Sequence, residues 1–254
     1  GNQTAAILFY YILGRWEEKK KLTGKEFIVS TIVTTELLKR IAEKFKVEYF
    51  ECLTGFKFIA DVIRRQEGKM KYIVGGEESF GYLVGDFVRD KDAVSACALI
   101  AEATAWMANQ GKTLFDLMIN INQKLGFYKE QLISVTKKGK SGAEEIQKMM
   151  LNYRNEPPAE INNSRVILIK DYLLLIEKDM ITGKERVLDL PKSNVLQFFL
   201  EDGSRISVRP SGTEPKIKYY FGVKEKLGAK EEYDTTDAIL TKKINDIIVS
   251  MKIR

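Results

Sequence analysis

The run Glu26-Phe-Ile-Val-Ser-Thr-Ile-Val33 is short, apolar and rich in β-branched residues, as expected of a buried β-strand. Thr34 and Thr35 follow it directly and can cap a helix. Helical and strand patterns then alternate along the chain, as helix 34–45, strand 47–53, helix 55–65 and strand 71–74. Such alternation is typical of β-α-β crossovers, so the sequence predicts an α/β fold.

The same pattern extends from this core in both directions. Before it, Asn2 or Thr4 can cap a segment whose apolar residues recur at helical spacing, namely Ala6, Phe9, Tyr10, Leu13 and Trp16. After it, Asp92 can cap an alanine-rich helix that reaches about Asn109. Helices over 114–124 and 143–153 and a strand over 131–136 are also predicted. We therefore assign residues 1–153 to one α/β domain.

The pattern changes from alternating helices and strands to mainly strands, which predicts a second domain. Turn-forming residues with paired prolines predict a linker over 154–163. The following segment, 164–254, is expected to form strands 165–170, 172–177, 195–200, 205–208 and 216–223 and a closing helix 236–251. Asp202-Gly203 predicts a hairpin turn between two of these strands. The second domain is expected to be α+β with an antiparallel sheet.

The composition limits the ligands and the catalytic residues that this chain can use. The 254 residues carry 41 Lys+Arg against 35 Asp+Glu, a net charge of +6 that favours anionic ligands. The lysine clusters lack interleaved aromatic residues, so nucleic-acid binding is not expected. The chain contains no histidine, which excludes His general bases, His metal ligands and Ser-His-Asp triads. Catalysis would depend on Lys, Arg, carboxylates or hydroxyls.

Location is predicted from two further features. No apolar run approaches the roughly 18 to 20 residues of a membrane-spanning helix, so no membrane association is expected. Cys52 and Cys97 are the two cysteines, and their apolar or mixed surroundings favour reduced thiols. These features predict a cytoplasmic protein.

A phosphate-binding loop is predicted at Arg209-Pro-Ser-Gly-Thr-Glu-Pro215. Arg209 offers a planar fork for two phosphate oxygens, Ser211 and Thr213 add hydroxyl donors, and Gly212 lets backbone N–H groups approach. Lys216 and Lys218 follow at once and favour this interpretation. The alternative is a tight turn whose Ser and Thr bond only to their own backbone.

A second candidate site lies at Gly76-Glu-Glu-Ser-Phe-Gly81. Adjacent carboxylates point in different directions, so one is expected to face a ligand while the other supports it. A carboxylate suits two neighbouring sugar hydroxyls, and Ser79 can add a hydrogen bond. Without a third oxygen ligand nearby the two carboxylates make a poor Mg²⁺ site, so no metal ligand is predicted. A charged surface loop is the alternative.

Two shorter segments can contribute to the same site. Lys91, flanked by Asp90 and Asp92, could present an ammonium to a phosphate or sugar oxygen, or could belong to an ordinary charged helix start. Thr54 and Gly55 precede a helix, where backbone N–H groups favour anions.

These four segments, in this order and spacing, resemble the α-D-phosphohexomutase family, specifically domains three and four of its phosphoglucomutase and phosphomannomutase branch. The resemblance implies a three-layer α/β domain with a mixed sheet, followed by a smaller α+β domain like the TATA-box-binding protein. Members interconvert hexose 1-phosphates and 6-phosphates through a phosphoserine and a bisphosphorylated sugar.

The resemblance also implies residue roles. Glu77 and Ser79 match the sugar-binding loop, Thr54 and Gly55 line the sugar pocket, and Lys91 lies near the reacting hydroxyl. The phosphate that is not transferred would be held by Arg209, Ser211, Gly212 and Thr213. Lys218 is also predicted to bind the substrate, because it lies just after this loop.

The family's phosphoserine loop and its acidic Mg²⁺ loop belong to its first two domains, and neither pattern occurs here. The resemblance thus implies that Mg²⁺ and glucose 1,6-bisphosphate serve the full-length parent, whose missing N-terminal domains are the expected partner. This chain would be inactive alone.

Three other interpretations stay open at the level of sequence. A stand-alone sugar-phosphate-binding or regulatory module would carry the same loops without ever having had a catalytic half. Half of a phosphopentomutase would carry them for a pentose substrate. A basic nucleic-acid binder would show affinity that falls steeply with salt.

Overall fold

The computed structural model describes residues 1–137, 139–212 and 214–253. The chain folds into two compact units. Unit 1 comprises Gly1–Tyr128 and Lys226–Tyr233, and unit 2 comprises Lys129–Glu225 and Asp234–Arg254. No described helix is long and apolar enough to cross a bilayer.

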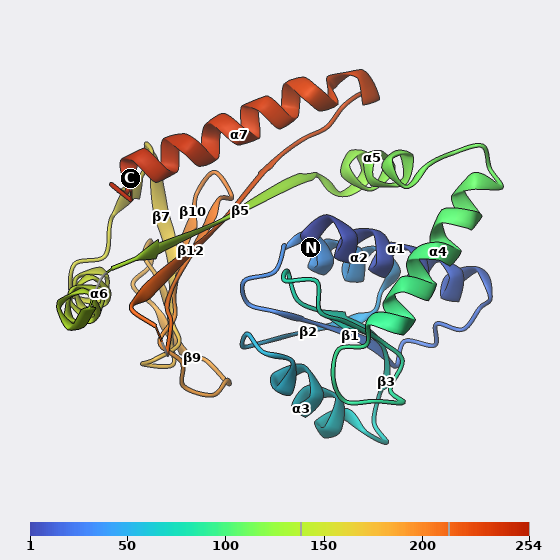
Figure 1. The fold of residues 1–254 in the computed structure, drawn as a ribbon, viewed down its shortest axis with the longest axis horizontal. Helices are drawn as coiled ribbons and strands as arrows, with labels where there is room; N and C mark the ends of the chain where they lie inside the picture. Colours follow the sequence, from blue (N-terminus) through green and yellow to red (C-terminus); the bar gives the residue numbers. More distant parts are fainter. Residues whose placement is uncertain (138, 213, 254) are drawn as a thin grey trace. The chain divides into compact units, whose positions relative to one another are not determined.

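Unit 1 is an α/β domain built around a four-stranded sheet, sheet A (Figure 1). Its helices are α1 (Asn2–Glu18), α2 (Leu37–Phe45), α3 (Phe56–Gln66), α4 (Ala93–Ala108) and α5 (Leu114–Leu125), together with the 3₁₀ turn η1 (Lys230–Glu232). Its strands are β1 (Glu26–Thr31), β2 (Glu48–Cys52), β3 (Lys71–Gly76) and β4 (Tyr82–Val84), in the order β2-β1-β3-β4. β1 pairs in parallel with β2 and β3, whereas β4 is antiparallel to β3, so sheet A is mixed.

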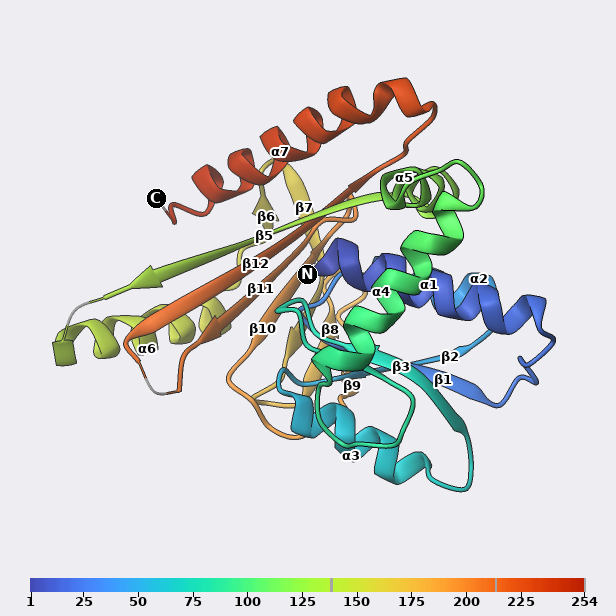
Figure 2. The same cartoon turned by 45° about the vertical axis from the view of Figure 1, so that its right-hand side comes forward.

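Helices cover both faces of sheet A because its central strand is apolar on both sides. On one face, Ile28 and Val74 pack with α1, α2, α4 and α5. Figure 2 shows α4 and α5 beside α1. On the other face, Phe27 and Val29 pack with Ile59 of α3. Every residue of β1 is buried, as expected for a central parallel strand between two helical layers. The predicted three-layer α/β arrangement is confirmed.

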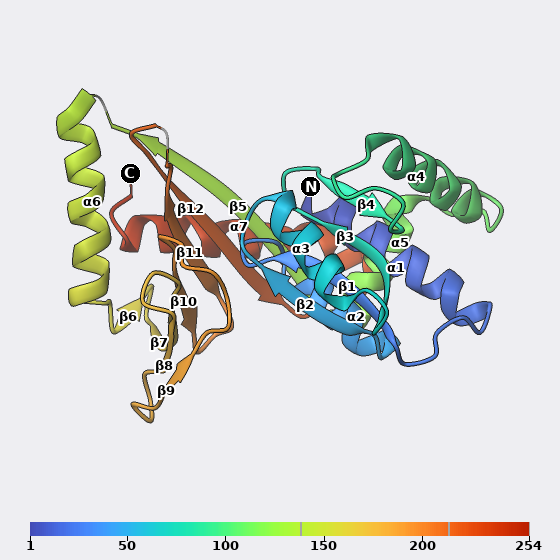
Figure 3. The ribbon, with the colours of Figure 1, turned by 90° about the horizontal axis from the view of Figure 1, so that it is seen from below.

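Unit 2 is built on an eight-stranded sheet, sheet B, with the order β5-β12-β11-β10-β7-β8-β9 and β6 paired to β7 (Figure 3). Its strands are β5 (Phe127–Thr136, most of which falls in unit 2), β6 (Glu160–Ile161), β7 (Ser164–Asp171), β8 (Ile176–Asp179), β9 (Glu185–Val187), β10 (Leu196–Leu200), β11 (Arg205–Pro210) and β12 (Lys216–Glu225). Its helices are α6 (Gly139–Asn155) and α7 (Tyr233–Ser250). The pairs from β6 to β12 are antiparallel, in agreement with the predicted α+β class.

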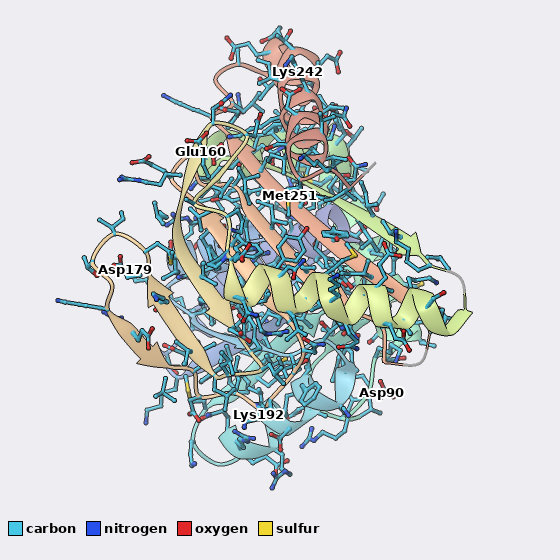
Figure 4. The ribbon with its side chains drawn as sticks, turned by 90° about the vertical axis from the view of Figure 1, so that its left-hand side faces the viewer. Asp90, Glu160, Asp179, Lys192, Lys242 and Met251 are labelled. Carbon is cyan, nitrogen blue, oxygen red and sulfur yellow. The ribbon has the colours of Figure 1, made fainter. Side chains whose placement is uncertain are left out.

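The two faces of sheet B differ in chemistry. One face carries Phe198, Ile206 and Tyr219, and α6 covers it, with Tyr153 and Phe198 ring centroids 5.9 Å apart. Figure 4 shows α6 lying across the sheet on this side. The opposite face carries the buried polar residues Gln197 and Ser207. Sheet B therefore has one apolar, helix-covered face and one polar face.

The division between the units differs from the expected boundary. Residues 129–153 were expected in the first domain, but they belong to unit 2, because β5 hydrogen-bonds to β12 and α6 packs on sheet B. α6 also extends to Asn155, two residues into the predicted linker 154–163.

Smaller differences have local causes. The predicted strand 172–177 begins only at Ile176, because the Asp171 carboxylate accepts hydrogen bonds from the N–H groups of Leu173 and Leu174 and holds a turn. Gly1 caps α1, while Asn2 Oδ1 instead accepts from the Thr35 N–H. The predicted Asp92 cap of α4 is confirmed, since its carboxylate accepts from the N–H groups of Val94 and Ser95. The short strands β4, β6 and β9 were not predicted, and β6 lies within the predicted linker.

Candidate functional site

The Glu77 loop follows β3 at the carboxyl end of a parallel strand of sheet A, where α/β folds commonly bind ligands. The Glu77 side chain is buried, and its Oε1 accepts a 2.7 Å hydrogen bond from the Gly55 N–H. Gly55 has a φ of 120°, a conformation that favours glycine, so the loop before α3 can turn its N–H toward the carboxylate. Two predicted site segments 22 residues apart are thereby brought into contact.

The two adjacent carboxylates diverge, as the sequence predicts. Glu77 faces the Gly55 segment, whereas Glu78 Oε2 accepts from the hydroxyls of Thr34 at 3.2 Å and Thr31 at 3.4 Å. Thr31 and Thr34 were not proposed as site residues. Thr31 ends β1 and Thr34 follows it, and the ends of neighbouring parallel strands meet at one edge of a sheet. They fix the direction of the Glu78 carboxylate.

Lys91 lies at the same loop. A Cβ added at Gly81 would fall 3.2 Å from Lys91 Cδ and 3.4 Å from Glu77 Oε2, so both side chains border this glycine. The Lys91 ammonium is exposed, 3.1 Å from Asp90 Oδ1 and 5.7 Å from the centre of the Phe56 ring. A cation and a buried carboxylate therefore both lie beside Gly81.

The remaining predicted residues of this site are Thr54 and Ser79. Thr54 Oγ1 is buried and has no hydrogen-bond partner within the described part of the chain. Ser79 is exposed beside Phe80, which has a φ of 65° and a side chain that is 71% exposed. Thr54 thus offers an unused hydroxyl under the loop, and Ser79 offers one at its surface.

The loop also perturbs Cys52 at the end of β2. Burial raises the pKa of the Cys52 thiol, and the nearby carboxylates of Glu77 and Glu51 raise it further. The thiol is therefore kept protonated, and both it and the exposed Cys97 are free, as predicted.

The Arg209 loop connects β11 to β12 in unit 2. Arg209 lies directly opposite Lys218 in the antiparallel register, so both side chains project from the same face of sheet B. Like charges directly opposite each other are destabilising unless an anion lies between them. On the same face, a buried chain of hydrogen bonds runs from the Tyr172 hydroxyl to Gln197 at 2.6 Å and from Gln197 Nε2 to Ser207 Oγ at 2.8 Å. This polar face accommodates a pair of cations.

Backbone hydrogen bonds close the loop itself. The Ser211 N–H donates to the Lys216 carbonyl at 2.7 Å, and the Glu214 N–H donates to Ser211 Oγ at 3.3 Å. Lys216 Nζ lies 2.9 Å from Glu214 Oε2, and this lysine lowers the pKa of Glu214. Gly212 is exposed, with open space where a Cβ would lie. Thr213 lies outside the described residues.

A pocket of about 450 Å³ adjoins this loop. It is lined by Pro210, Ser211, Gly212, Glu214 and Pro215 of the loop and by residues of α6, including Ala143 and Ile146. Because side chains alternate along β11, Pro210 lies on the helix-covered face and Arg209 on the opposite one. The pocket therefore adjoins the helix-covered side of the loop, whereas the side chains of Arg209 and Lys218 project from the opposite face of sheet B. We assign the candidate phosphate site to the Arg209 face.

Across residues 1–137, 139–212 and 214–253, no three His, Cys, Asp or Glu side chains lie close enough together to hold a metal ion.

Solved structures with similar folds include a phosphoglucomutase and a putative phosphomannomutase. Parafusin, a phosphoglucomutase of Paramecium, aligns over 97% of this chain and 41% of its own, with a TM-score of 0.64 and 21% identity. The putative phosphomannomutase of Thermus thermophilus aligns over 97% of this chain and 39% of its own, with a TM-score of 0.58 and 13% identity. These likenesses support the fold.

Relatives found by sequence are also phosphoglucomutases. The chain is 40% identical over 224 residues to a phosphoglucomutase of Staphylococcus aureus, and 35% identical over 223 residues to that of Staphylococcus haemolyticus. Each match covers 88% of this chain and 40% of the relative, so the chain spans less than half the length of these relatives.

Family sequence profiles match both parts of the chain. Residues 1–125 match the profile described as phosphoglucomutase/phosphomannomutase, alpha/beta/alpha domain III, and residues 157–236 match the C-terminal domain of the same family. The first match covers sheet A with the Glu77 loop, and the second covers most of sheet B with the Arg209 loop. With both profiles matched in order on the expected folds, the chain belongs to the phosphoglucomutase/phosphomannomutase family, of which it carries domain III and the C-terminal domain.

Proposed function

We propose that this chain is the sugar- and phosphate-binding part of an enzyme that interconverts hexose 1-phosphate and hexose 6-phosphate. The names of the phosphoglucomutase relatives support the reaction class, and the two loops support a division of labour. In this proposal unit 2 holds the phosphate that is not transferred, and unit 1 holds the sugar.

The observation that carries the proposal is the alignment of Arg209 with Lys218 across β11 and β12. A phosphate dianion would relieve the repulsion between these cations and accept the planar fork of the guanidinium. Ser211, Gly212 and Thr213 would add donors at the loop. Arginine gives this contact a direction that a lysine would not, because its N–H groups lie in one plane.

On the sugar side, Glu77 would accept hydrogen bonds from two neighbouring hydroxyls. Its carboxylate is already oriented by the Gly55 N–H, so little further ordering is needed when a sugar binds. Thr54 and Ser79 would supply hydroxyls, and Lys91 would present its ammonium to the reacting hydroxyl. A glucose phosphate is the proposed substrate, with mannose and pentose phosphates as the alternatives.

The phosphoryl transfer itself would need groups that this part of the enzyme does not supply. In the proposal, a phosphoserine and a Mg²⁺ site in the remaining domains exchange a phosphoryl group with the sugar, and glucose 1,6-bisphosphate is the intermediate. Mg²⁺ would supply charge neutralisation at the transferring phosphate. The residues of this chain would bind and orient the sugar and hold its second phosphate.

A titration with glucose 6-phosphate tests the phosphate site. Arg209→Ala should weaken binding about tenfold or more, because a charge-assisted contact to phosphate is lost. Chemical shifts of the isotope-labelled chain would measure the affinity, and mannose 6-phosphate and ribose 5-phosphate in the same titration would rank the substrates.

The matched control is Arg165→Ala, which removes an exposed arginine of unit 2 that pairs with Glu201. Binding should be unchanged in this variant. Equal affinities of the Arg209 and Arg165 variants would refute the assignment of the phosphate site.

A further inference from the structure

Unit 1 contains a pocket of about 400 Å³ that the proposed function does not use. It is formed by the C-terminal part of α1, the end of α2, the end of α4 and one side of α5, with Lys230 of η1 at its border. This volume is within the usual range for small-molecule sites. Its lining combines aromatic rings with an excess of cations.

Aromatic side chains from three helices make its walls. The Tyr11 and Trp106 ring centroids lie 5.4 Å apart, and the Arg15 guanidinium lies 4.5 Å from the centre of the Trp106 ring. Tyr10 and Phe45 meet edge to face at 5.3 Å. Flat, polarisable surfaces of this kind favour a planar aromatic ligand over a sugar.

The charged groups of the lining favour an anion. Arg15 pairs with Glu18, and Lys230 Nζ lies 2.5 Å from Asp116 Oδ1. Lys44, Lys112 and Lys124 also line the pocket, together with one further carboxylate, Glu17, and no ion pair of these three lysines is found among the described residues. Lys44 Nζ lies 4.4 Å from the centre of the Phe45 ring. The lining therefore keeps an excess of positive charge for a ligand.

Gly14 provides the space for a ligand. It lies inside α1, where glycine costs about 1 kcal/mol relative to alanine. Its backbone does not require glycine, since its φ is not positive, and an added Cβ would meet only Phe45 Cζ, at an ordinary 3.8 Å. The helix thus omits a side chain at a point where one would project toward the pocket.

The pocket is separate from the Glu77 loop. Gly1, at the start of α1, lies against that loop, because the Tyr82 hydroxyl donates to the Gly1 carbonyl at 2.6 Å and a Cβ at Gly1 would collide with the Glu78 carbonyl. Gly14 lies about 20 Å further along the helix, at 1.5 Å per residue. A ligand in the pocket would not contact the sugar site.

We propose that this pocket binds a nucleoside phosphate. The base would lie against Trp106 and the neighbouring tyrosines, and the phosphate would contact lysines of the lining, such as Lys44 or Lys124. A sugar phosphate would leave the aromatic walls unused, and an uncharged aromatic compound would leave the lysines unused. The combination of both features selects a ligand that has both parts.

Tryptophan fluorescence of the full chain tests this proposal. The chain has two tryptophans, and the Trp16→Phe variant leaves Trp106 as the reporter inside the pocket. AMP should quench this fluorescence saturably. Adenosine, which lacks the phosphate, and ribose 5-phosphate, which lacks the base, should each bind at least about tenfold more weakly, since each loses one class of contact.

Two substitutions at Gly14 form a matched pair in this background. Gly14→Leu should abolish AMP binding because its side chain occupies the pocket. Gly14→Ala should retain binding and raise the melting temperature, since alanine favours the helix.

Lys44→Gln combined with Lys124→Gln should weaken AMP binding about three- to tenfold, the effect expected of two exposed charges.

Three results would overturn the proposal. They are the absence of saturable quenching by AMP, equal affinities for AMP and adenosine, and full AMP binding by the Gly14→Leu variant. Arg209→Ala should leave the AMP titration unchanged, so this test and that of the sugar-phosphate site can fail independently.

Discussion

At the scale of single residues, the Glu26 carboxylate stabilises the turn that precedes β1. The Glu26 side chain is only 4% exposed at the start of β1, and it accepts hydrogen bonds from the Thr23 hydroxyl at 2.8 Å and from the N–H groups of Thr23 and Gly24 at 2.9 and 3.0 Å. Burial alone would raise the pKa of this carboxyl, but these hydrogen bonds outweigh burial and lower it. The ionised form therefore stabilises the fold.

This environment predicts a pH-dependent effect of Glu26→Gln. Because the folded pKa lies below the unfolded value of about 4.3, the carboxylate stabilises the fold above that pH and loses its contribution as the pH falls through the folded pKa. The variant should be less stable by about 1 to 3 kcal/mol at pH 7, and the difference should shrink below pH ~4. Urea unfolding followed by tryptophan fluorescence reports on unit 1, which contains both Trp16 and Trp106.

Glu48→Gln at the exposed start of β2 is the control and should change little at any pH. A stability difference for Glu26→Gln that stays constant from pH 7 to pH 3 would contradict this account.

At the scale of elements, Arg154 fastens the last turn of α6 to sheet B. Its Nε donates to Asp171 Oδ2 at 2.9 Å, and its guanidinium also donates to Asn194 Oδ1 at 2.6 Å. Both charged side chains of the ion pair are about nine-tenths buried. This contact holds the helix to β7 and to the segment before β10.

Arg154→Met should therefore lower the free energy of unfolding of unit 2 by about 3 kcal/mol, because it leaves the buried Asp171 carboxylate without its cation. Tryptophan fluorescence would not detect this, since both tryptophans lie in unit 1. Hydrogen exchange of the backbone amides in β10 to β12 would measure it. Arg165→Met removes an exposed ion pair and should cost about 1 kcal/mol at most. If the two variants lose similar free energies of unfolding, burial of the Arg154–Asp171 pair is not the cause of the loss.

At the scale of the whole molecule, the chain spans about 40% of the relatives that it matches. We expect no mutase turnover from this chain with glucose 1-phosphate, Mg²⁺ and glucose 1,6-bisphosphate, because the proposed phosphoserine and metal loops lie outside it. A coupled assay for glucose 6-phosphate measures this. Adding the N-terminal domains of the Staphylococcus aureus relative should restore turnover if the two parts associate. Turnover by the chain alone, at a rate above background, would disprove this prediction.

Most elements of the fold were predictable because their signals are local. The β-branched run at β1 and the Asp92 cap of α4 each depend on residues within a few positions of one another. The Asp202-Gly203 turn is similar, since Gly203 has a φ of 81° and the Gly203 N–H donates to the Leu200 carbonyl. β9 was missed because it has three exposed residues and no apolar alternation.

The candidate site was predictable in part. Its loops are continuous segments whose composition indicates phosphate and sugar contacts, so Arg209 and Glu77 could be proposed from sequence. Thr31 and Thr34 could not, because their hydrogen bonds to Glu78 form only after the strands are side by side. The roles of the predicted residues remain proposals.

By itself the sequence determined the α/β and α+β classes, the order of the elements and the two candidate loops, because these depend on local periodicity, capping and turn chemistry. Only the tertiary structure decided that residues 129–153 join unit 2, that Arg209 faces Lys218 and that Gly55 orients Glu77. Each of these depends on a pairing between segments distant in the chain. Such pairings form where they bury apolar surface and satisfy backbone hydrogen bonds together, which no single segment specifies.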